Sequence, residues 1–253
     1  MNNADDILSL ALELGRNMLE CGGEVSRSED TVGRICRAYG AKEAEVFSVL
    51  SFISGTIIMP DGTKCTQMRR IRYCTNNLHR LERLNTLSRH ICKKLPSDGV
   101  CKRLLNETCK SEPYNRYFIY AGAVTAAFSL TLYFGGAFED AVCSAVIGSF
   151  ISFFEQHRHN SINRIIYTLI VSAFAGAASR IMVMSGFGKS IDSIMIGTIM
   201  LQIPGMAFGN AIRDLICDDI IAGSSRLVQA VLIAVAIAIG FAVGLILTGE
   251  WKI

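Results

Sequence analysis

The sequence predicts a membrane protein in which a small cytoplasmic α+β domain, residues 1–113, precedes an all-α bundle of five transmembrane helices, residues 114–253. Of the 253 residues, 51% are hydrophobic and 19% are charged, whereas soluble domains carry about 25% charged residues. The charges are unevenly placed, with 17 Lys and Arg and 14 Asp and Glu before residue 114 and eight of each sign after it. The third observation is a set of five apolar segments, all in the second half.

The composition also excludes two other classes of protein. Nine cysteines are scattered without a Cys-x-x-Cys pair, which excludes a secreted disulfide scaffold. Seven of them precede residue 114, as suits a domain in a reducing cytoplasm. The net charge of +3 is too small, and the chain too apolar, for intrinsic disorder. Residues Met1–Asp6 are polar and acidic, so we expect no signal peptide and a first domain that stays in the cytoplasm.

The first domain begins with two predicted helices. Apolar residues recur at helical spacing over residues 7–18, and Gly22 and Gly23 are expected to end that helix. The second helix is predicted to start at a capping box, in which the Ser26 hydroxyl and the Glu29 carboxylate each satisfy a free backbone amide.

A small sheet and two more helices are predicted to complete this domain. Residues 45–73 are rich in β-branched and aromatic side chains around the turn signal Pro60-Asp61-Gly62, which predicts an antiparallel meander. Helices are predicted over residues 78–95 and 97–108. His79 and His90 share a face of the first of these at about 16 Å, which is too far for one metal ion. We expect no metal, no cofactor and no nucleic-acid partner. The basic helix is expected to present a solvated face, and contact with anionic lipid is the alternative.

The second half is predicted to cross the cell inner membrane five times, although its second segment is short for the roughly 20 residues that a span needs. The apolar segments cover residues 117–134, 141–154, 165–184, 191–212 and 227–247. Arginines lie beside the connections that would face the cytoplasm: Arg116, Arg158, Arg164, Arg213 and Arg226. The opposite connections carry few positive charges, so we expect the N-terminus in the cytoplasm and the C-terminus outside.

The fourth apolar segment has the most unusual chemistry. Pro204, followed by Gly205, is expected to kink or unwind the helix and expose backbone dipoles to a solute. Asn210 and Asp214 are four residues apart and therefore share a face just cytoplasmic of that break. These four residues, together with Arg180 and Asp192, form the predicted substrate pathway. For Asp214, an ordinary ion pair with Arg213 or Arg226 is an open alternative.

Two further charges and two glycine pairs belong to this half. Arg180 and Asp192 lie near the outer ends of the third and fourth segments, where they could pair along the pathway, or Arg180 could snorkel to the interface. Close helix packing is predicted at Gly205-x-x-x-Gly209 and Gly240-x-x-x-Gly244, either within this bundle or against another subunit.

Two stretches of this sequence resemble motifs of the threonine/serine exporter family. Residues Gly22–Thr31 resemble its "small-glycine-x-x-Ser/Thr-Arg-x-Glu-x-Thr" signature, although Ser28 stands where we expect an apolar residue. The motif residues of this cytoplasmic stretch are Glu24, Ser26, Arg27, Glu29 and Thr31. Residues Pro204–Asp214, followed by Gly223 and Arg226-Leu227, resemble the fourth-span motif of the same family.

The resemblance implies a cytoplasmic domain, five spans and export of small polar metabolites, which are threonine and serine in the fused members. Long members carry a second, shorter membrane module, and this chain stops at Ile253. It therefore resembles the larger subunit of the two-component bacterial exporters, one of which handles the C4-dicarboxylate succinate. We expect a separately encoded, small membrane subunit as an obligate partner, and a homo-oligomer stays open because five spans cannot hold two equal inverted halves.

A second hypothesis comes from another class of protein. The first domain could be an enzyme or a sensor that the membrane segments merely anchor. An anchor needs only one span, so we expect a transporter and no enzyme. In favour of the alternative, the capping box leaves Arg27 in the first motif without an explanation.

Overall fold

The computed structural model describes residues 3–110, 115–158 and 163–249. Two compact units divide these residues. The first unit combines the N-terminal region with residues 206–227, and the second combines the region from residue 114 to 205 with the chain after residue 227. Pro113, the predicted domain boundary, and Ile253, the predicted outer end, lie outside the described residues. Segment 206–227, predicted to belong to the membrane half, thus packs with the first unit.

The first unit is an α+β structure, as predicted from the sequence. Its elements, in chain order, are α1 (Ala4–Glu20), α2 (Val25–Ala38), β1 (Glu43–Val49), β2 (Phe52–Ile58), β3 (Lys64–Arg70), α3 (Leu78–Lys94) and α4 (Asp98–Lys110). The sheet is an antiparallel meander in the order β1-β2-β3, which confirms the predicted meander. In the turn between β2 and β3 the Asp61 side chain accepts a hydrogen bond from the Thr63 N–H at 2.9 Å, and Gly62 takes a φ of +85°.

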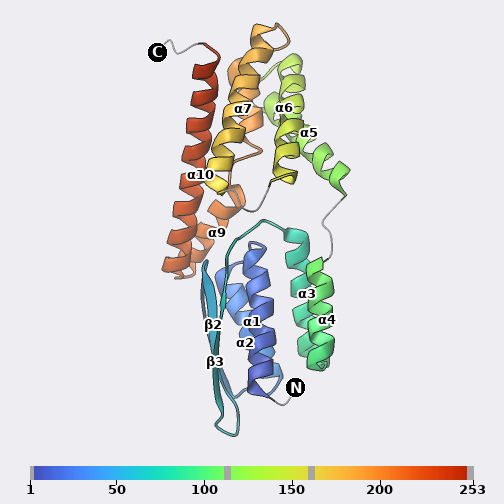
Figure 1. Cartoon of the computed structure of the whole chain (residues 1–253), viewed down its shortest axis with the longest axis vertical. Coiled ribbons are helices and arrows are strands. Elements are labelled where there is room, and N and C mark those ends of the chain that lie inside the picture. Colours follow the sequence, from blue (N-terminus) through green and yellow to red (C-terminus); the bar gives the residue numbers. More distant parts are fainter. Residues whose placement is uncertain (1–2, 111–114, 159–162, 250–253) are drawn as a thin grey trace. The chain divides into compact units, whose positions relative to one another are not determined.

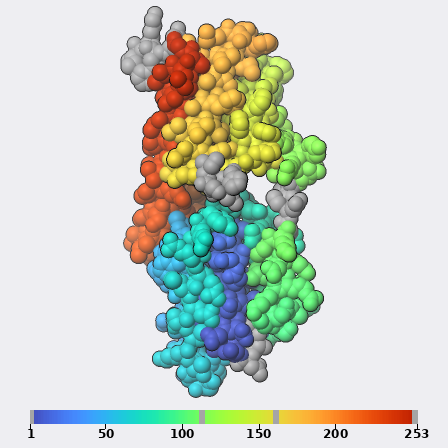
Figure 2. Space-filling view, in the orientation of Figure 1, coloured from blue at the N-terminus to red at the C-terminus, as the bar shows by residue number. Residues whose placement is uncertain are grey.

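Helix α1 is the central element of this unit. It packs on β2 and β3 and also contacts α3 and α4 (Figure 1). In the space-filling view α1, in dark blue, lies between the strands and α4 (Figure 2). Because α1 is covered on more than one side, it buries Leu8 and Leu12 as well as the predicted Ile7 and Leu14.

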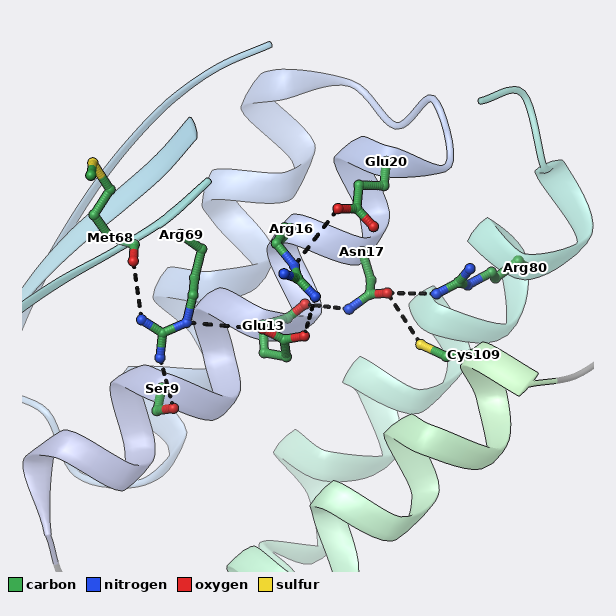
Figure 3. A network of polar contacts seen from close by, with 9 residues as sticks. All are labelled: Ser9, Glu13, Arg16, Asn17, Glu20, Met68, Arg69, Arg80 and Cys109. Atoms are coloured by element: carbon green, nitrogen blue, oxygen red, sulfur yellow. Dashed lines mark hydrogen bonds and ion pairs between the residues drawn. The ribbon is translucent and has the colours of Figure 1, made fainter. Parts of the chain in front are cut away.

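Polar contacts along α1 join it to its neighbours (Figure 3). The buried Asn17 accepts hydrogen bonds from Arg80 of α3 at 2.6 Å and from the Cys109 thiol of α4 at 3.2 Å. Glu13 pairs with Arg69 of β3 at 3.9 Å. These contacts satisfy polar groups that would otherwise be costly to bury between layers.

The start of α2 differs from the prediction. The helix begins at Val25 with Glu24 as its N-cap residue, and no side chain caps it there. Ser26 lies inside the first turn, and Glu29 instead accepts hydrogen bonds from the backbone and hydroxyl of Ser48 at the end of β1. The predicted capping box is therefore wrong, because a tertiary contact takes the Glu29 carboxylate.

The second unit is helical within the described residues. It contains α5 (Arg116–Tyr133), α6 (Phe138–Gln156), α7 (Arg164–Met184), α8 (Ile191–Ile199) and α10 (Ile220–Leu247) from Val228 onward. Among the residues that the structure describes, α7 and α10 are long and apolar enough to cross a membrane. The fivefold crossing stays a prediction.

Close backbone packing joins α7 and α10 within the second unit (Figure 1). A Cβ atom added to Gly240 would lie 2.5 Å from the Leu169 carbonyl oxygen, and one added to Gly244 would overlap the Ala173 carbonyl. The glycine pair therefore has an internal role, the first of the two alternatives for this motif. By contrast, a Cβ atom at Gly205 or Gly209 would meet no atom of the described residues within 4 Å.

Candidate functional site

The two family-like motifs meet in the first unit. Four polar side chains of segment 206–227 hold the loop between α1 and α2. The segment begins with α9 (Gly205–Ile216) and ends in the first turns of α10. We call this set of contacts the loop clasp; it consists of Gly22, Gly23 and Glu24 with Asn210, Arg213, Asp214 and Arg226.

Two of the clasp side chains donate hydrogen bonds to loop carbonyls. Asn210 Nδ2 donates to the Gly22 oxygen at 3.0 Å, and Arg226 Nη2 donates to the Gly23 oxygen at 3.2 Å. Both glycines are needed for this loop. Gly22 has a φ of +86°, and a Cβ atom at Gly23 would lie 2.8 Å from the Met18 carbonyl oxygen. The glycine pair thus lets the loop present its carbonyl groups to the clasp.

The clasp contains a buried ion pair. Arg226 Nε lies 3.3 Å from Asp214 Oδ2, and the two residues are 5% and 1% exposed. Neither Asp214 oxygen accepts a well-aligned hydrogen bond from a described residue. Asp214 lies outside the two helices that could cross a membrane, and burial raises the pKa of its carboxyl group, while the Arg226 guanidinium and the Val25 N–H oppose the shift. The carboxylate therefore depends on Arg226, because an unpaired buried charge is strongly destabilising.

A second ion pair of the clasp is exposed. Arg213 pairs with Glu24, and their side chains are 62% and 22% exposed. Exposed pairs of this kind contribute about 0–1 kcal/mol. The clasp thus places a strong buried interaction beside a weak exposed one on the same loop.

The outer face of α9 is apolar. Asn210 and Asp214 point to the loop, while Phe208, Ile212 and Ile216 are exposed on the opposite face of the same helix. A helix with a polar face turned toward its own unit and an apolar face outward is typical of a position at a membrane interface.

The predicted pathway residues fall into three places. Asn210 and Asp214 belong to the clasp, so Asp214 has the Arg226 pairing that the sequence left open. Pro204 and Gly205 lie where the fourth segment is interrupted. In the second unit, Arg180 lies on α7, and Asp192 is exposed in the first turn of α8.

The remaining motif residues lie along the first two turns of α2. The Thr31 hydroxyl donates to the Arg27 carbonyl oxygen at 2.8 Å, within the helix. The Arg27 side chain is exposed. Ser26 is half-buried beside the loop clasp.

The fourth segment is broken, as the Pro204-Gly205 pair predicts. Helix α8 has 9 residues and ends at Ile199, and α9 starts at Gly205. At about 1.5 Å per residue, α8 is about 14 Å long, roughly half of the 30 Å hydrocarbon core of a bilayer. The intervening residues 200–204 are not helical.

Sequence reasoning missed a polar pair at this break. The hydroxyl of Ser172 on α7 donates to Gln202 Oε1 at 2.8 Å, and Ser172 is fully buried. The Gln202 Nε2 is buried and donates to no described residue. An amide two residues before the lone proline of an apolar segment was the available signal. A buried donor of this kind can bind a carboxylate or hydroxyl oxygen of a small polar solute.

The matches to known proteins cover both of these motifs. Residues 9–248 match the family described as "Putative threonine/serine exporter". The protein of Mycobacterium tuberculosis named "Probable threonine/serine exporter" is 22% identical over 249 residues, which cover 94% of this chain and 46% of that protein. An uncharacterized protein of Schizosaccharomyces pombe is 24% identical over 251 residues, which cover 94% of this chain and 32% of that protein. This chain thus spans less than half the length of these relatives. No solved structure matches it.

Proposed function

Because the chain belongs to the threonine/serine exporter family, we propose that it is a subunit that exports small polar metabolites across the cell inner membrane. The observation that carries this proposal is the broken fourth segment, with the buried and unpaired Gln202 amide beside it. Transporters commonly bind solutes at discontinuous helices, where unwound backbone and polar side chains replace the hydration shell of the solute.

The solute would meet Gln202 and Ser172 first. The free Gln202 Nε2–H donors suit an oxygen of a solute carboxylate, and the hydroxyl of Ser172 holds the amide in place through its hydrogen bond to Oε1. Threonine, serine and C4-dicarboxylates such as succinate all carry such a carboxylate. These remain the candidate substrates.

The loop clasp would connect the cytoplasmic unit to the moving segment. It holds α9, which follows the break directly, and the first turns of α10, which continues into the second unit. A change in the α1–α2 loop would therefore reach both ends of segment 206–227 through the chain itself. This role would explain why the two family-like motifs are bound to each other.

The proposed topology has several spans, with the N-terminus in the cytoplasm and the C-terminus outside. The exposed Cys217 lies between α9 and α10, on the side we assign to the cytoplasm. Tyr133, exposed at the end of α5, lies on the opposite side. A membrane-impermeant thiol reagent should label Tyr133→Cys in intact cells and Cys217 only after permeabilisation. The reverse pattern would exclude this topology.

A second membrane subunit is also proposed. Helix α7 already covers Gly240 and Gly244. The Gly205/Gly209 face is therefore the better surface for a partner, because an added Cβ atom meets no described residue there. Purified single chain in liposomes should show no flux until the partner is added. Robust flux from this chain alone would refute an obligate second subunit. If the particles that give this flux are homodimers, the homo-oligomer would be favoured.

The test of export itself uses the proline at the break. Pro204→Ala should allow a continuous helix across residues 200–204, and we expect at least a tenfold slower efflux of labelled threonine, serine or succinate. Pro60→Ala, in the β2–β3 turn, is the matched control and should export at the wild-type rate. Equal efflux by both variants, at equal membrane abundance, would place the pathway elsewhere. A deletion of the cytoplasmic domain distinguishes the two hypotheses. Efflux that persists after this deletion would favour a transporter over a membrane-anchored enzyme or sensor.

A further inference from the structure

A polar groove lies along α2 and α3 in the first unit, outside the loop clasp. Its volume is about 430 Å³, within the roughly 300–1,000 Å³ of small-molecule sites. Most of its lining is polar, with cationic, anionic and neutral hydrogen-bonding side chains. The polar lining residues include Arg27, Asp30, Thr31, Glu82, Asn85 and Arg89.

The cationic part of the groove has unused donors. The guanidinium of Arg27 makes no hydrogen bond or ion pair with the residues that the structure describes. Arg89 donates from Nε to the Asn85 carbonyl oxygen of its own helix at 3.3 Å, and its other nitrogens donate to no residue that the structure describes. Two guanidinium groups from facing helices can therefore bind a carboxylate with several hydrogen bonds.

The anionic part of the groove lies among these arginines. Asp30 pairs with Arg34 on the exposed face of α2, and Glu82 reaches the groove from α3. The Thr31 hydroxyl and the Asn85 amide already donate to helix carbonyls, so they retain mainly acceptor oxygens. Carboxylates and acceptor oxygens are the groups that bind an ammonium ion.

We infer that this groove is a cytoplasmic binding site for a small zwitterionic amino acid, with its carboxylate on Arg27 and Arg89 and its ammonium group on Asp30 and Glu82. A dicarboxylate fits less well, because its second carboxylate would face Glu82 and Asp30. Arg34 also lines the groove, but its guanidinium is paired with Asp30. The site gives Arg27 of the first motif a ligand-binding role that helix capping does not provide.

The groove shares α2 with the loop clasp. Val25 starts α2 at the clasp, and Arg27 and Thr31 follow within two turns on the same helix. A ligand that bridges α2 and α3 would therefore act on the helix whose first turn carries the clasped loop. That the bound amino acid regulates export rests on the proposed function, whereas its binding does not.

The test is calorimetric titration of the purified full-length chain in detergent with L-serine and L-threonine. Three probes test the charge requirement. Ethanolamine carries only the ammonium group, glycolate carries only one carboxylate, and succinate carries two carboxylates. We expect saturable binding of the amino acids alone. Arg27→Gln and Glu82→Gln should each weaken that binding at least tenfold, and Arg103→Gln, an exposed arginine of α4 outside the groove, should leave it unchanged.

Three results would overturn the inference: no saturable amino-acid binding, binding that Arg27→Gln leaves intact, or succinate binding as tight as that of serine. Binding that survives Arg27→Gln but is lost in Gln202→Leu would assign it to the membrane unit instead. A chain that binds serine in the groove yet exports nothing would uphold this site and refute the proposed function.

Discussion

The two units bury opposite kinds of side chain. The N-terminal part of the first unit, residues 3–110, encloses large aliphatic residues such as Ile7, Leu12 and Ile53 and buries no charged side chain. The second exposes large apolar residues such as Phe150, Ile170 and Ile239 and buries small hydroxyls and Asp140. Water dictates the first arrangement and a lipid environment the second. The difference teaches how to interpret segment 206–227 of the first unit, which buries charge against the N-terminal part of that unit and exposes apolar residues on its other face.

The strongest way to break this arrangement is to remove one charge of the buried pair. Asp214→Ala leaves the Arg226 guanidinium buried without a counter-ion, and we expect a loss of about 3–5 kcal/mol in the free energy of unfolding of the first unit. Chemical denaturation of the detergent-solubilised chain measures it. Asp98→Ala, which breaks the exposed pair with Lys102, is the control and should cost about 0–1 kcal/mol.

A double variant distinguishes lost pairing from lost packing. Asp214→Leu with Arg226→Met removes both charges, so it should be clearly less destabilising than Asp214→Ala. If the double variant is as unstable as the two single losses added together, the pair is not a coupled unit and the clasp needs another explanation.

The next largest effect belongs to the second unit. Gly244→Ala places a methyl group against the Ala173 carbonyl, and we expect a loss of about 1–3 kcal/mol from overpacking of α7 on α10. Gly209→Ala is the matched control, since its added Cβ meets nothing, and it should gain about 0.5–1 kcal/mol from helix propensity. Thermal unfolding measures both variants. Equal shifts in their melting temperatures would contradict this packing of α7 on α10.

The reactivity of Cys21 is expected to report on the loop clasp. Cys21 ends α1 beside the loop, and burial raises the pKa of its thiol to about 11; burial also raises the pKa of Cys36 to about 12. At pH 8 both thiols stay protonated and react slowly with iodoacetamide, while the exposed Cys217 reacts fast.

Arg226→Gln should loosen the loop and speed alkylation of Cys21 several-fold, with Cys36 unchanged as the internal control. Peptide mapping by mass spectrometry measures each site. Equal acceleration at Cys21 and Cys36 would mean that the whole unit opens, against a local clasp.

The smallest effect is expected at the exposed pair. Arg213→Ala removes the ion pair with Glu24. Because the Arg213 side chain is largely exposed, this loss should cost about 0.2–1 kcal/mol. Denaturation of this variant beside Arg226→Ala compares two arginines that hold the same loop. A loss as large as that of Arg226→Ala would contradict the assigned difference in burial.

Local patterns predicted the elements well. Helical spacing predicted α1 to α4, the turn residues predicted the meander, and the Pro204-Gly205 pair predicted the break. What failed depended on distant residues. The capping box failed because Ser48 binds Glu29, and the Val25 amide lies beside Asp214, which is nearly 190 residues away in the chain.

The candidate site was predictable only in part. The sequence placed Asn210 and Asp214 on one face of a helix, which is correct, but could not show that this face holds the Gly22-Gly23 loop. Gln202 escaped notice because its importance comes from Ser172 on another helix. Pairings of this kind depend on tertiary packing, which periodicity does not report.

The central claim is that a solute crosses at the break, where Ser172 positions Gln202. The most direct measurement is efflux of labelled threonine, serine and succinate by Ser172→Ala and Ser179→Ala chains at equal membrane abundance. Both serines are fully buried on α7. Ser172 bonds to Gln202, whereas Ser179 bonds, among the described residues, only to the Ala175 carbonyl of its own helix. We predict that Ser172→Ala lowers efflux at least tenfold, as does Gln202→Leu, and that Ser179→Ala exports at the wild-type rate. Wild-type efflux from Ser172→Ala and Gln202→Leu would contradict the claim.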